Sequence, residues 1–524
     1  MSEFHVGIDV GGTNTDAVLM KDHRVAGAVK AATTADVTTG ITKALKKLFD
    51  SSGIAPDDVG AVMIGTTHFT NAFIEAKDLL PVAALRLCGP ATRAILPLLD
   101  WPERLRAAVG DHVFMCSGGH EYDGRLIATV DPNELRQVAA SIRDRGLEAV
   151  AISSVFSPIT DSHEREAAEI ISSELAQAAI SLSSEIGRLG LLERENATIV
   201  NASLSGLAVR IVRSLEEAVA RLAIEAPVYF SQNDGTLMSA QYTRRYPVAT
   251  FASGPTNSMR GAAYLSGAQD CAVIDVGGTT TDIGVLRQGF PREAPIAVDL
   301  GGVRTNFRMP DVQSLGLGGG SIVRTTPELV IGPDSVGFDL SARAIVFGGD
   351  TLTATDVVVA AGMAEVGDPA KVKSLDRVLV ADAVIWMREQ VADALDRMKV
   401  GPAPEPVVLV GGGSILLGDD LPGASAVIRP EHFSVANAIG AAIAQVGGRV
   451  ERIVKFDDRP RADAIEDVRR EAIERCVSAG ARRDSVRIID VEEVPLAYLP
   501  SDAVRITVKA VGDLEAGVNA ANAR

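Results

Sequence analysis

Val6-Gly-Ile-Asp-Val-Gly-Gly-Thr-Asn-Thr-Asp-Ala-Val-Leu19 and Val273-Ile-Asp-Val-Gly-Gly-Thr-Thr-Thr-Asp-Ile-Gly-Val-Leu286 are two nearly identical stretches of this 524-residue chain. In each, an apolar strand-like segment leads into two glycines and a second apolar segment, a pattern that predicts a β-hairpin. The copies are separated by about half of the chain, far more than the roughly 20 to 50 residues of a solenoid repeat. The repeating unit is therefore a whole lobe, and two lobes of similar fold are predicted.

The rest of the chain alternates helical and strand patterns, which favours an α/β fold with parallel sheets covered by helices. Apolar residues make up 47% of the sequence and aromatic residues only 4%, which suits aliphatic parallel strands and small-residue helices. Helices are expected over 39–50, 161–177 and 193–223, and strands over 149–153, 226–230, 407–410, 485–491 and 503–510.

Three domains are expected from these patterns and from shifts in composition. They are an N-terminal lobe over 1–190, a second lobe over 191–446, and a small α+β C-terminal module over 447–524. The proline-rich segment 401–406 is expected to form a stiff connector before the strand at 407–410.

Charge and cysteine content exclude several classes of function. A net charge of −17 opposes binding to a phosphate backbone, so nucleic acid is not expected as a partner. The four cysteines are scattered without a CxxC pair, which argues against a disulfide framework or an iron-sulfur site. The N-terminus lacks a basic and apolar leader, and no apolar run reaches about 18 residues. We expect a cytoplasmic protein with no membrane association.

The two glycine turns have the chemistry of a phosphate-binding site. Turns without Cβ atoms let backbone N–H groups approach a bulky anion, and neighbouring hydroxyls add further donors. The residues expected to bind ATP phosphates are Gly11, Gly12, Thr13, Asn14, Thr15, Gly277, Gly278, Thr279 and Thr280.

Aspartates flank both turns. Asp9 and Asp275 end the first strand of each hairpin and are expected to hold Mg²⁺, which prefers oxygen ligands and keeps most of its waters. Asp16 and Asp282 follow the turns and are candidate catalytic carboxylates together with Asp9 and Asp275. A purely structural alternative for Asp16 and Asp282 is that they cap the turns by accepting backbone hydrogen bonds.

A third glycine motif, Gly411-Gly-Gly-Ser414, follows the strand at 407–410. Its lack of side chains would let backbone pass against an adenine or ribose, so Gly411, Gly412, Gly413 and Ser414 are the expected adenosine-binding residues. With one hairpin in each lobe, we expect ATP to lie in the cleft between the lobes, where closure would expel water.

Further motifs resemble a known family. The hairpins and the GGG segment resemble those of the superfamily that contains actin, sugar kinases and heat-shock chaperone ATPases. Five more segments are similar, in order, to motifs of the hydantoinase and oxoprolinase ATPase subunit: Gly65-Thr-Thr-His-Phe-Thr-Asn-Ala-Phe73, Ala252-Ser-Gly-Pro255, Leu315-Gly-Leu-Gly-Gly-Gly-Ser-Ile322, Gly332-Pro-Asp-Ser335 and Thr353-Ala-Thr-Asp356. The resemblance implies a two-lobed actin-like ATPase fold with duplicated ribonuclease H-like lobes.

The resemblance also implies a function. ATP would phosphorylate the amide oxygen of a cyclic amide or imide, of hydantoin, 5-oxoproline or lactam type, before water opens the ring. Thr66, Thr67 and Asn71 become candidates for the substrate side, while His68 is expected only to pack. Gly318-Gly-Gly-Ser321, comprising Gly318, Gly319, Gly320 and Ser321, becomes a second loop for a phosphoryl group or oxyanion. The alternative for that loop is a flexible surface turn.

Some features depart from the family pattern, and other functions stay open. The chain is shorter than typical family subunits, its C-terminal extension does not show the usual larger module, and Gly118 to Gly124 and Leu182 to Asn196 look like a short branch of the family. Family members commonly work beside a second, non-homologous subunit, and an oligomer is expected. The alternatives are a small-molecule kinase of the same fold and a nucleotide switch acting on a protein partner. A radical-enzyme activator would need a cysteine-held cluster, which the scattered cysteines disfavour.

Overall fold

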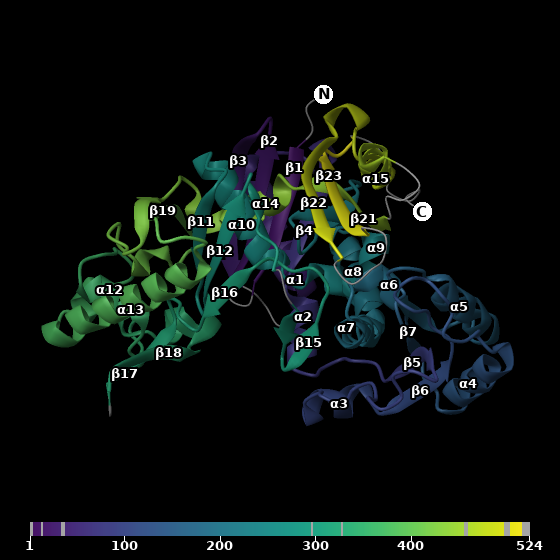
Figure 1. Cartoon of the computed structure of the whole chain (residues 1–524). Coiled ribbons are helices and arrows are strands. Elements are labelled where there is room, and N and C mark those ends of the chain that lie inside the picture. The colour runs from purple at the N-terminus through teal and green to yellow at the C-terminus, as the bar shows by residue number, and fades with distance from the viewer. Residues whose placement is uncertain are drawn as a thin grey trace.

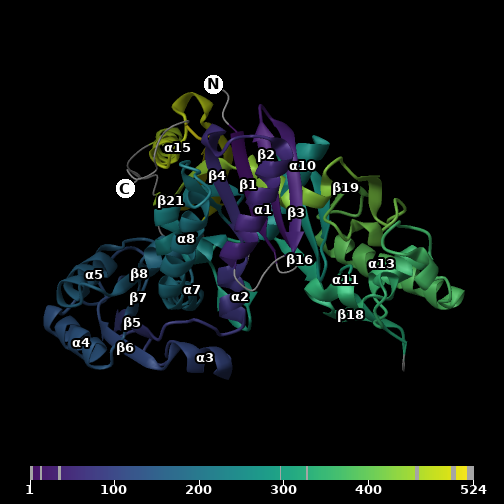
Figure 2. The same ribbon diagram turned by 180° about the vertical axis from the view of Figure 1, so that it is seen from behind.

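The computed structural model describes residues 4–11, 14–32, 37–294, 297–325, 328–454, 460–496 and 503–515. Figures 1 and 2 show these residues arranged as a broad arch. The N-terminal and C-terminal strands form its crown, the second lobe extends to one side, and a smaller sheet with its own helices extends to the other. The α/β architecture expected from the sequence is confirmed.

Both predicted hairpins form. Strand β1 (Phe4–Val10) pairs antiparallel with β2 (Asn14–Lys21), and β11 (Cys271–Val276) pairs antiparallel with β12 (Thr281–Arg287). The registers correspond, because Asp9 lies opposite Asp16 in the first hairpin and Asp275 lies opposite Asp282 in the second. Each pair of aspartates is thus fixed at the same place beside its turn.

The two lobes share one strand order, which confirms the duplication. In the first lobe the order is β3-β2-β1-β4-β9, and in the second it is β13-β12-β11-β19-β20. The first three strands of each set are antiparallel neighbours, and the fourth and fifth are added in parallel. The bounds not yet given are β3 (Arg24–Ala32), β4 (Val59–Thr66), β9 (Val228–Ser231), β13 (Phe290–Pro291), β19 (Glu405–Val410) and β20 (Ala424–Ile428).

Helices cover these sheets where the apolar periodicity predicts them. In α1 (Val37–Ser52), Ile41, Ala44, Leu45 and Leu48 recur at helical spacing and are fully buried against the first lobe's core. The helical pattern over 193–223 forms two helices, α7 (Leu191–Ser203) and α8 (Ser205–Ala220). Most of the expected strand segments are also present, although their ends shift by a few residues.

A four-stranded parallel sheet is inserted between β4 and β9, with strand order β6-β5-β7-β8. Its elements are β5 (Val82–Gly89), β6 (His112–Ser117), β7 (Ala149–Ser154), β8 (Ala179–Leu182), α4 (Pro132–Asp144) and α5 (Ser162–Glu174). Arg86 of β5 is completely buried and donates from Nε to Glu195 Oε1 of α7 at 2.8 Å. This buried ion pair fastens the inserted sheet to the rest of the first lobe.

The C-terminal strands continue the first lobe's sheet. β21 (Gln445–Val454) pairs in parallel with β10 (Thr236–Ser239), and β23 (Val504–Gly512) and β22 (Arg487–Pro495) follow it outward, giving nine strands. Helix α15 (Arg461–Ser478) packs on this extension. The first lobe's sheet therefore contains strands from both sides of the expected boundaries at 190/191 and 446/447. The division into three domains stays a prediction.

Two helices cross at the junction of the lobes, α10 (Ser253–Ser266) and α14 (Ala436–Ala442). A Cβ at Gly261 would lie 1.9 Å from the carbonyl oxygen of Ala436, and one at Gly440 would lie 1.8 Å from that of Asn257. Glycine is required at both positions because the helix backbones are in direct contact. The crossing holds the two hairpins at a fixed separation.

Within the described residues, no helix is both long and apolar enough to cross a bilayer.

Replacement of Gly261 by alanine is expected to destabilise the protein by about 1 to 3 kcal/mol, because overpacking at the crossing outweighs alanine's helix propensity. Gly401→Ala is the matched control, since a Cβ there meets no heavy atom within 4 Å. Urea unfolding measures both variants. Equal midpoints for the two variants would contradict the close crossing.

Candidate functional site

Four carboxylates from the two hairpins gather at the junction of the lobes. Asp9 and Asp16 are only 5% and 3% exposed. Burial, reinforced by the charges of Asp16 and Asp275, raises the pKa of Asp9 to about 7. Burial also raises the pKa of Asp282 to about 6, with a smaller contribution from Asp275. The charge of Asp275 acts on Asp9, so the carboxylates of the two hairpins are within electrostatic reach of one another.

Few groups compensate this charge. Lys30 of β3 forms an ion pair with Asp16 at 2.6 Å, but burial still raises the pKa of Asp16. Asn437 of α14 donates from Nδ2 to Asp9 Oδ2 at 2.9 Å, and the hydroxyl of Ser314 donates to Asp282. Burial raises the pKa of Asp275 as well. The cluster is therefore short of positive charge, which is the condition that a bound cation would relieve.

The turns of the hairpins have equivalent backbone geometry. The N–H of Gly11 donates to the carbonyl of Asn14 at 3.0 Å, and that of Gly277 donates to the carbonyl of Thr280 at 2.8 Å. Thr15 is buried, whereas Gly278 and Thr279 are partly exposed and Thr280 is exposed. Gly12 and Thr13, two of the expected phosphate-binding residues, lie outside the described residues. Phosphate binding by the turns stays a prediction that this geometry supports.

The third glycine motif is fitted against the second hairpin. The N–H of Gly413 donates to the carbonyl of Val276 at 2.7 Å. A Cβ at Gly411, where φ is +86°, would lie 2.2 Å from Asp275 Oδ1, and one at Gly413 would lie 2.4 Å from the Gly277 carbonyl oxygen. Gly412, by contrast, faces open space, with no heavy atom within 4 Å of its Cβ position. Ser414 is buried. The motif thus presents bare backbone beside Asp275, and adenosine binding by Gly411 to Ser414 stays a prediction.

The loop at Gly318 to Ser321 was expected to be either a binding loop for a phosphoryl group or a flexible surface turn, and its geometry favours neither. It is buried and lies directly against the second hairpin, so it is not a flexible surface turn. Its N–H groups are already engaged: Gly319 and Gly320 donate to the carbonyls of Gly277 and Gly278 at 3.0 and 2.7 Å. Gly318 donates to the Ser321 hydroxyl, and Ser321 donates to the Gly318 carbonyl. The geometry therefore favours support of the phosphate turn over the expected contact with a phosphoryl group.

The expected substrate residues begin where β4 ends, beside the first hairpin. Gly65 pairs with Asp9, and a Cβ at Gly65 would lie 2.6 Å from Asp9 Oδ1. Thr66 is buried, exchanges hydrogen bonds with Ser253 at the start of α10, and its hydroxyl lies 2.6 Å from His68 Nδ1. His68 thus orients Thr66, which is more than the packing role expected for it.

Thr67 and Asn71 lie further from the carboxylates. Thr67 precedes α2 (His68–Ile74) and donates weakly to the Val10 carbonyl at 3.4 Å. Asn71 is exposed, one turn along α2. The structure therefore brings Thr66 and Thr67 to the first hairpin and leaves Asn71 at its margin.

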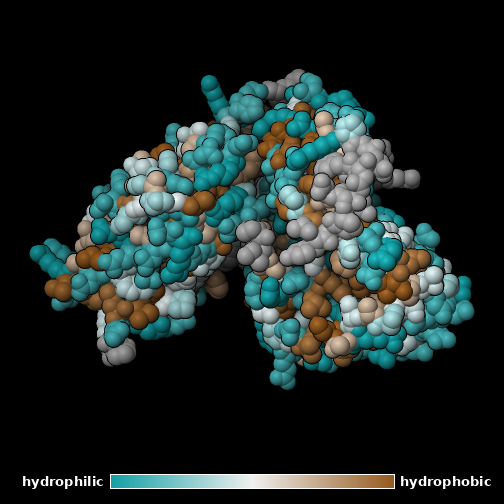
Figure 3. Space-filling model, in the orientation of Figure 1, coloured by the Kyte–Doolittle hydropathy of each residue, from teal (hydrophilic) through white to brown (hydrophobic). Residues whose placement is uncertain are grey.

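Figure 3 shows the molecule hollowed along its lower edge. In Figure 1, α2 and β16 (Val312–Leu315) lie on either side of this hollow. Since α2 follows β4 and β16 pairs with β12, each side is joined to one of the two hairpins. Asp275 and Asp282 also line a narrow crevice with Pro255 and Met259 of α10.

Sequence reasoning missed Lys30 and Asn437. Neither is part of a glycine motif, and Asn437 is distant in sequence from Asp9, so only the fold reveals their contacts. In the described part of the chain, no group of three or more histidine, cysteine, aspartate or glutamate side chains is placed to hold a metal ion. A Mg²⁺ held by one or two carboxylates together with water and phosphate oxygens does not need such a group.

Models of one family match most of the chain. The model described as the hydantoinase/oxoprolinase N-terminal region matches residues 5–175, and the hydantoinase/oxoprolinase model matches residues 194–368. The chain therefore belongs to the hydantoinase/oxoprolinase family, as the sequence motifs predicted.

Individual relatives agree with this assignment. Caprolactamase subunit alpha of Pseudomonas jessenii is 26% identical over 471 residues, covering 84% of this chain and 66% of the relative. The acetophenone carboxylase gamma subunit of Aromatoleum aromaticum is 24% identical over 390 residues, covering 68% of this chain and 53% of the relative. The chain thus spans just under two thirds of the first relative and about half of the second.

A solved structure shares the fold. The crystal structure of ATP-dependent caprolactamase from Pseudomonas jessenii matches with a TM-score of 0.78 and 21% sequence identity, over 97% of this chain and 88% of that chain. The two-lobed fold expected from the duplicated hairpins is confirmed by this match.

The raised pKa of Asp9 predicts a pH-dependent stability difference. Without nucleotide and metal, burial in the folded protein disfavours the charged form of Asp9. The contribution of Asp9 to the free energy of unfolding is therefore largest below pH about 4, where the carboxyl is protonated in both the folded and the unfolded state. This contribution is lost as pH rises through about 7, the pKa in the folded state. Asp9→Asn removes this loss. Its stability relative to wild type should rise over that range, with a limiting slope of about 1 kcal/mol per pH unit.

Urea unfolding at several pH values measures this difference, with Asp334→Asn as the exposed control. A stability difference between Asp9→Asn and wild type that does not change with pH would show that Asp9 titrates normally.

Proposed function

We propose that this chain is the ATP-dependent part of a hydrolase that opens a cyclic amide or imide. The observation that carries the proposal is the pair of matched aspartate hairpins, one from each lobe, whose buried or half-buried carboxylates lie within electrostatic reach of one another. Membership of the hydantoinase/oxoprolinase family and similarity to caprolactamase subunit alpha support the choice of reaction.

In this proposal the carboxylates and the turns divide the binding of Mg-ATP between them. Asp9 and Asp275 hold the hydrated Mg²⁺, which supplies the positive charge that Lys30 alone does not provide. The N–H groups of both glycine turns hold the phosphates, and Gly411 to Ser414 hold the nucleoside. Lys30 holds Asp16 in place, and Ser314 holds Asp282. The second aspartate of each hairpin is thus positioned to balance charge in the site or to accept a proton.

Ring opening would use ATP to activate the amide. Transfer of the γ-phosphoryl group to the amide oxygen releases ADP and makes the ring carbon electrophilic. Water then adds to that carbon, the C–N bond breaks as the nitrogen takes a proton, and a second water hydrolyses the resulting acyl phosphate to the acid and free phosphate. The protein's contribution is positioning and charge neutralisation, as in other phosphoryl transfers. Thr66, which His68 orients, and Thr67 contact the first hairpin, where they would recognise a small polar ring.

The proposal extends to a partner and a location. Two of the relatives are named as subunits, so we propose that this chain also works with a second, non-homologous subunit in an oligomeric cytoplasmic complex. We favour a cyclic amide over a ketone carboxylation because caprolactamase subunit alpha is similar over 84% of the chain, compared with 68% for the acetophenone carboxylase subunit.

Asp9→Asn and Asp275→Asn are each expected to weaken Mg-ATP binding by at least about tenfold, because one ligand of a charge-assisted site is lost. Isothermal titration calorimetry measures the affinity, and Asp334→Asn serves as the exposed control. Unchanged affinity in both variants would remove the metal role assigned to these aspartates.

The reaction is tested by its products. Hydantoins, 5-oxoproline and lactams should stimulate phosphate release and yield a ring-opened acid, in the presence of the co-purifying partner. A stable phosphorylated substrate would instead identify a kinase. ATP turnover that no cyclic amide stimulates would favour a nucleotide switch.

A further inference from the structure

A second polar site lies away from the carboxylate cluster. A cavity of about 700 Å³ is enclosed by the loop at Arg188 to Glu193, the turn joining β12 to β13, the segment from Arg304 to Arg308, and strands β21, β22 and β23. Its walls therefore come from the loop at the start of α7, from the second lobe and from the C-terminal extension of the first lobe's sheet. The volume is that of a small-molecule site.

The cavity is basic in a strongly acidic protein. Among the described residues, eight basic side chains line it against four acidic ones, although the whole chain carries a net charge of −17. The basic residues are Arg188, Arg287, Arg292, Arg304, Arg308, Arg449, Arg505 and Lys509. Some have acidic partners outside the lining, as Lys509 has in Asp234 at 2.8 Å. Arg287, Arg292 and Arg308 likewise pair with carboxylates outside the lining, those of Glu405, Asp311 and Glu451.

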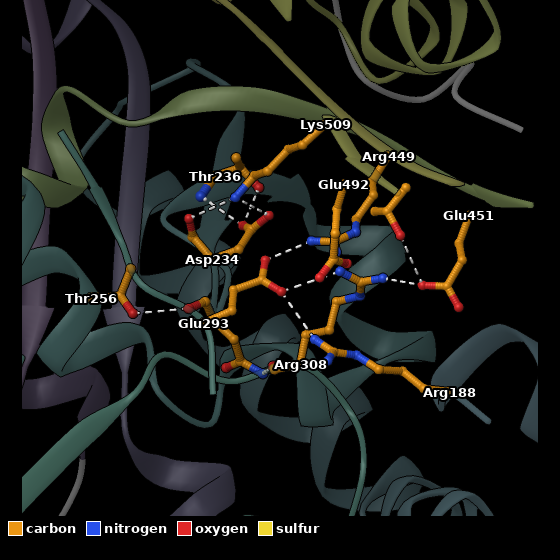
Figure 4. Close-up of polar contacts among 12 residues, drawn as sticks. Arg188, Asp234, Thr236, Thr256, Glu293, Arg308, Arg449, Glu451, Glu492 and Lys509 are labelled. Atoms are coloured by element: carbon orange, nitrogen blue, oxygen red, sulfur yellow. Dashed lines mark hydrogen bonds and ion pairs between the residues drawn. The ribbon is translucent and has the colours of Figure 1, made fainter. Parts of the chain in front are cut away.

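Three arginines in the cavity share one carboxylate. Figure 4 shows Arg188, Arg308 and Arg449 converging on Glu293, with N–O distances of 3.0, 3.2 and 2.6 Å. Arg308 has a second partner in Glu451, while Arg188 and Arg449 depend on Glu293. Burial lowers the pKa of Arg188; the charges of Glu293 and Glu451 act to raise it, and those of Arg449 and Arg505 act to lower it.

Arg505 lies beside this group and is weakly held. Its closest carboxylate is Glu492, at 3.5 Å. The guanidinium Nε atoms of Arg188, Arg449 and Arg505 are buried and have no acceptor. The centre of the cavity holds Glu293, Asp490 and Glu492, but these guanidinium N–H groups remain without acceptors, which an anion would supply.

The remaining walls indicate which kind of anion fits. Leu189, Phe290, Pro291, Phe307 and Ile489 contribute apolar surface next to the arginines. Guanidinium groups match carboxylate geometry, and the apolar walls match a short carbon skeleton. An organic acid with two or three carboxylates satisfies both.

The cavity is remote from the phosphate turns. Strand β12 begins at Thr281, beside the second turn, and ends at Arg287, in the cavity wall. Its length separates the two sites by about 20 Å. A ligand in the cavity would contact both lobes without reaching the carboxylate cluster.

We propose that this cavity is a binding site for a small di- or tricarboxylate, held by Arg188, Arg449 and Arg505 and distinct from the site for ATP. The ligand joins the second lobe to the C-terminal strands, so it is placed to influence the relative position of the lobes. The proposal does not depend on the proposed ring-opening activity.

Calorimetric titration of the full chain with citrate, without nucleotide or metal and at about 50 mM salt, tests the proposal. Citrate should bind with a Kd of about 1 mM or tighter, and Arg449→Gln should weaken binding at least about tenfold. Arg452→Gln is the matched control, because Arg452 is on the same strand but pairs with Glu471 outside the cavity. It should leave the affinity unchanged.

Two further variants guard against a simple folding defect. Arg505→Gln removes a weakly paired charge and should also weaken citrate binding, while Glu293→Gln frees three arginines and should strengthen it. Thermal melting confirms that each variant is folded.

Absence of citrate binding, or equal losses in Arg449→Gln and Arg452→Gln, would overturn the proposal. So would binding of an acidic peptide, but not of citrate, that Arg449→Gln abolishes, because the cavity would then be a docking site for a protein.

Discussion

The mutual repulsion of buried carboxylates at the junction of the lobes is the constraint on which the rest of the structure depends. Strand register fixes the backbone positions of Asp9, Asp16, Asp275 and Asp282; the side chains of Asp9 and Asp16 are buried, and those of Asp275 and Asp282 are half-buried. Burial raises the pKa of every one of them, and Lys30 is the cation in direct contact with the cluster among the described residues. A protein retains such a costly arrangement where a cation or a reacting group offsets it.

The scaffold around the cluster is built to keep this arrangement fixed. Helices α10 and α14 touch through Gly261 and Gly440, and each helix also supplies a polar group to the site. Asn437 on α14 donates to Asp9, and Ser253 at the start of α10 bonds the backbone at Thr66. The second hairpin is further supported by two glycine loops, which approach it too closely for a side chain at Gly318, Gly411 and Gly413. Helices α10 and α14 therefore both pack the two lobes together and supply hydrogen bonds to the site.

Local sequence patterns predicted the hairpins and the duplication, because strand length, turn glycines and flanking aspartates are all contained within about 14 consecutive residues. They also predicted the family, since its motifs are short and contiguous. The inserted four-stranded sheet and the attachment of β21 to β10 were not predicted, because strand partners far apart in sequence leave no local signal.

For a similar reason, the sequence did not predict that the loop at Gly318 to Ser321 supports the second hairpin. A glycine-rich stretch looks alike whether its N–H groups face a ligand or a neighbouring turn. Only the fold shows that they bond to the carbonyls of Gly277 and Gly278. The basic cavity was hidden because its arginines are spread from residue 188 to residue 505.

The most direct test of the account is hydrogen–deuterium exchange of the hairpin peptides with and without Mg-ATP. If one polyphosphate is held between the lobes, backbone N–H groups in 6–19 and 273–286 should both become protected, and only when magnesium is present. Protection of one hairpin alone, or of neither, would contradict a shared nucleotide site.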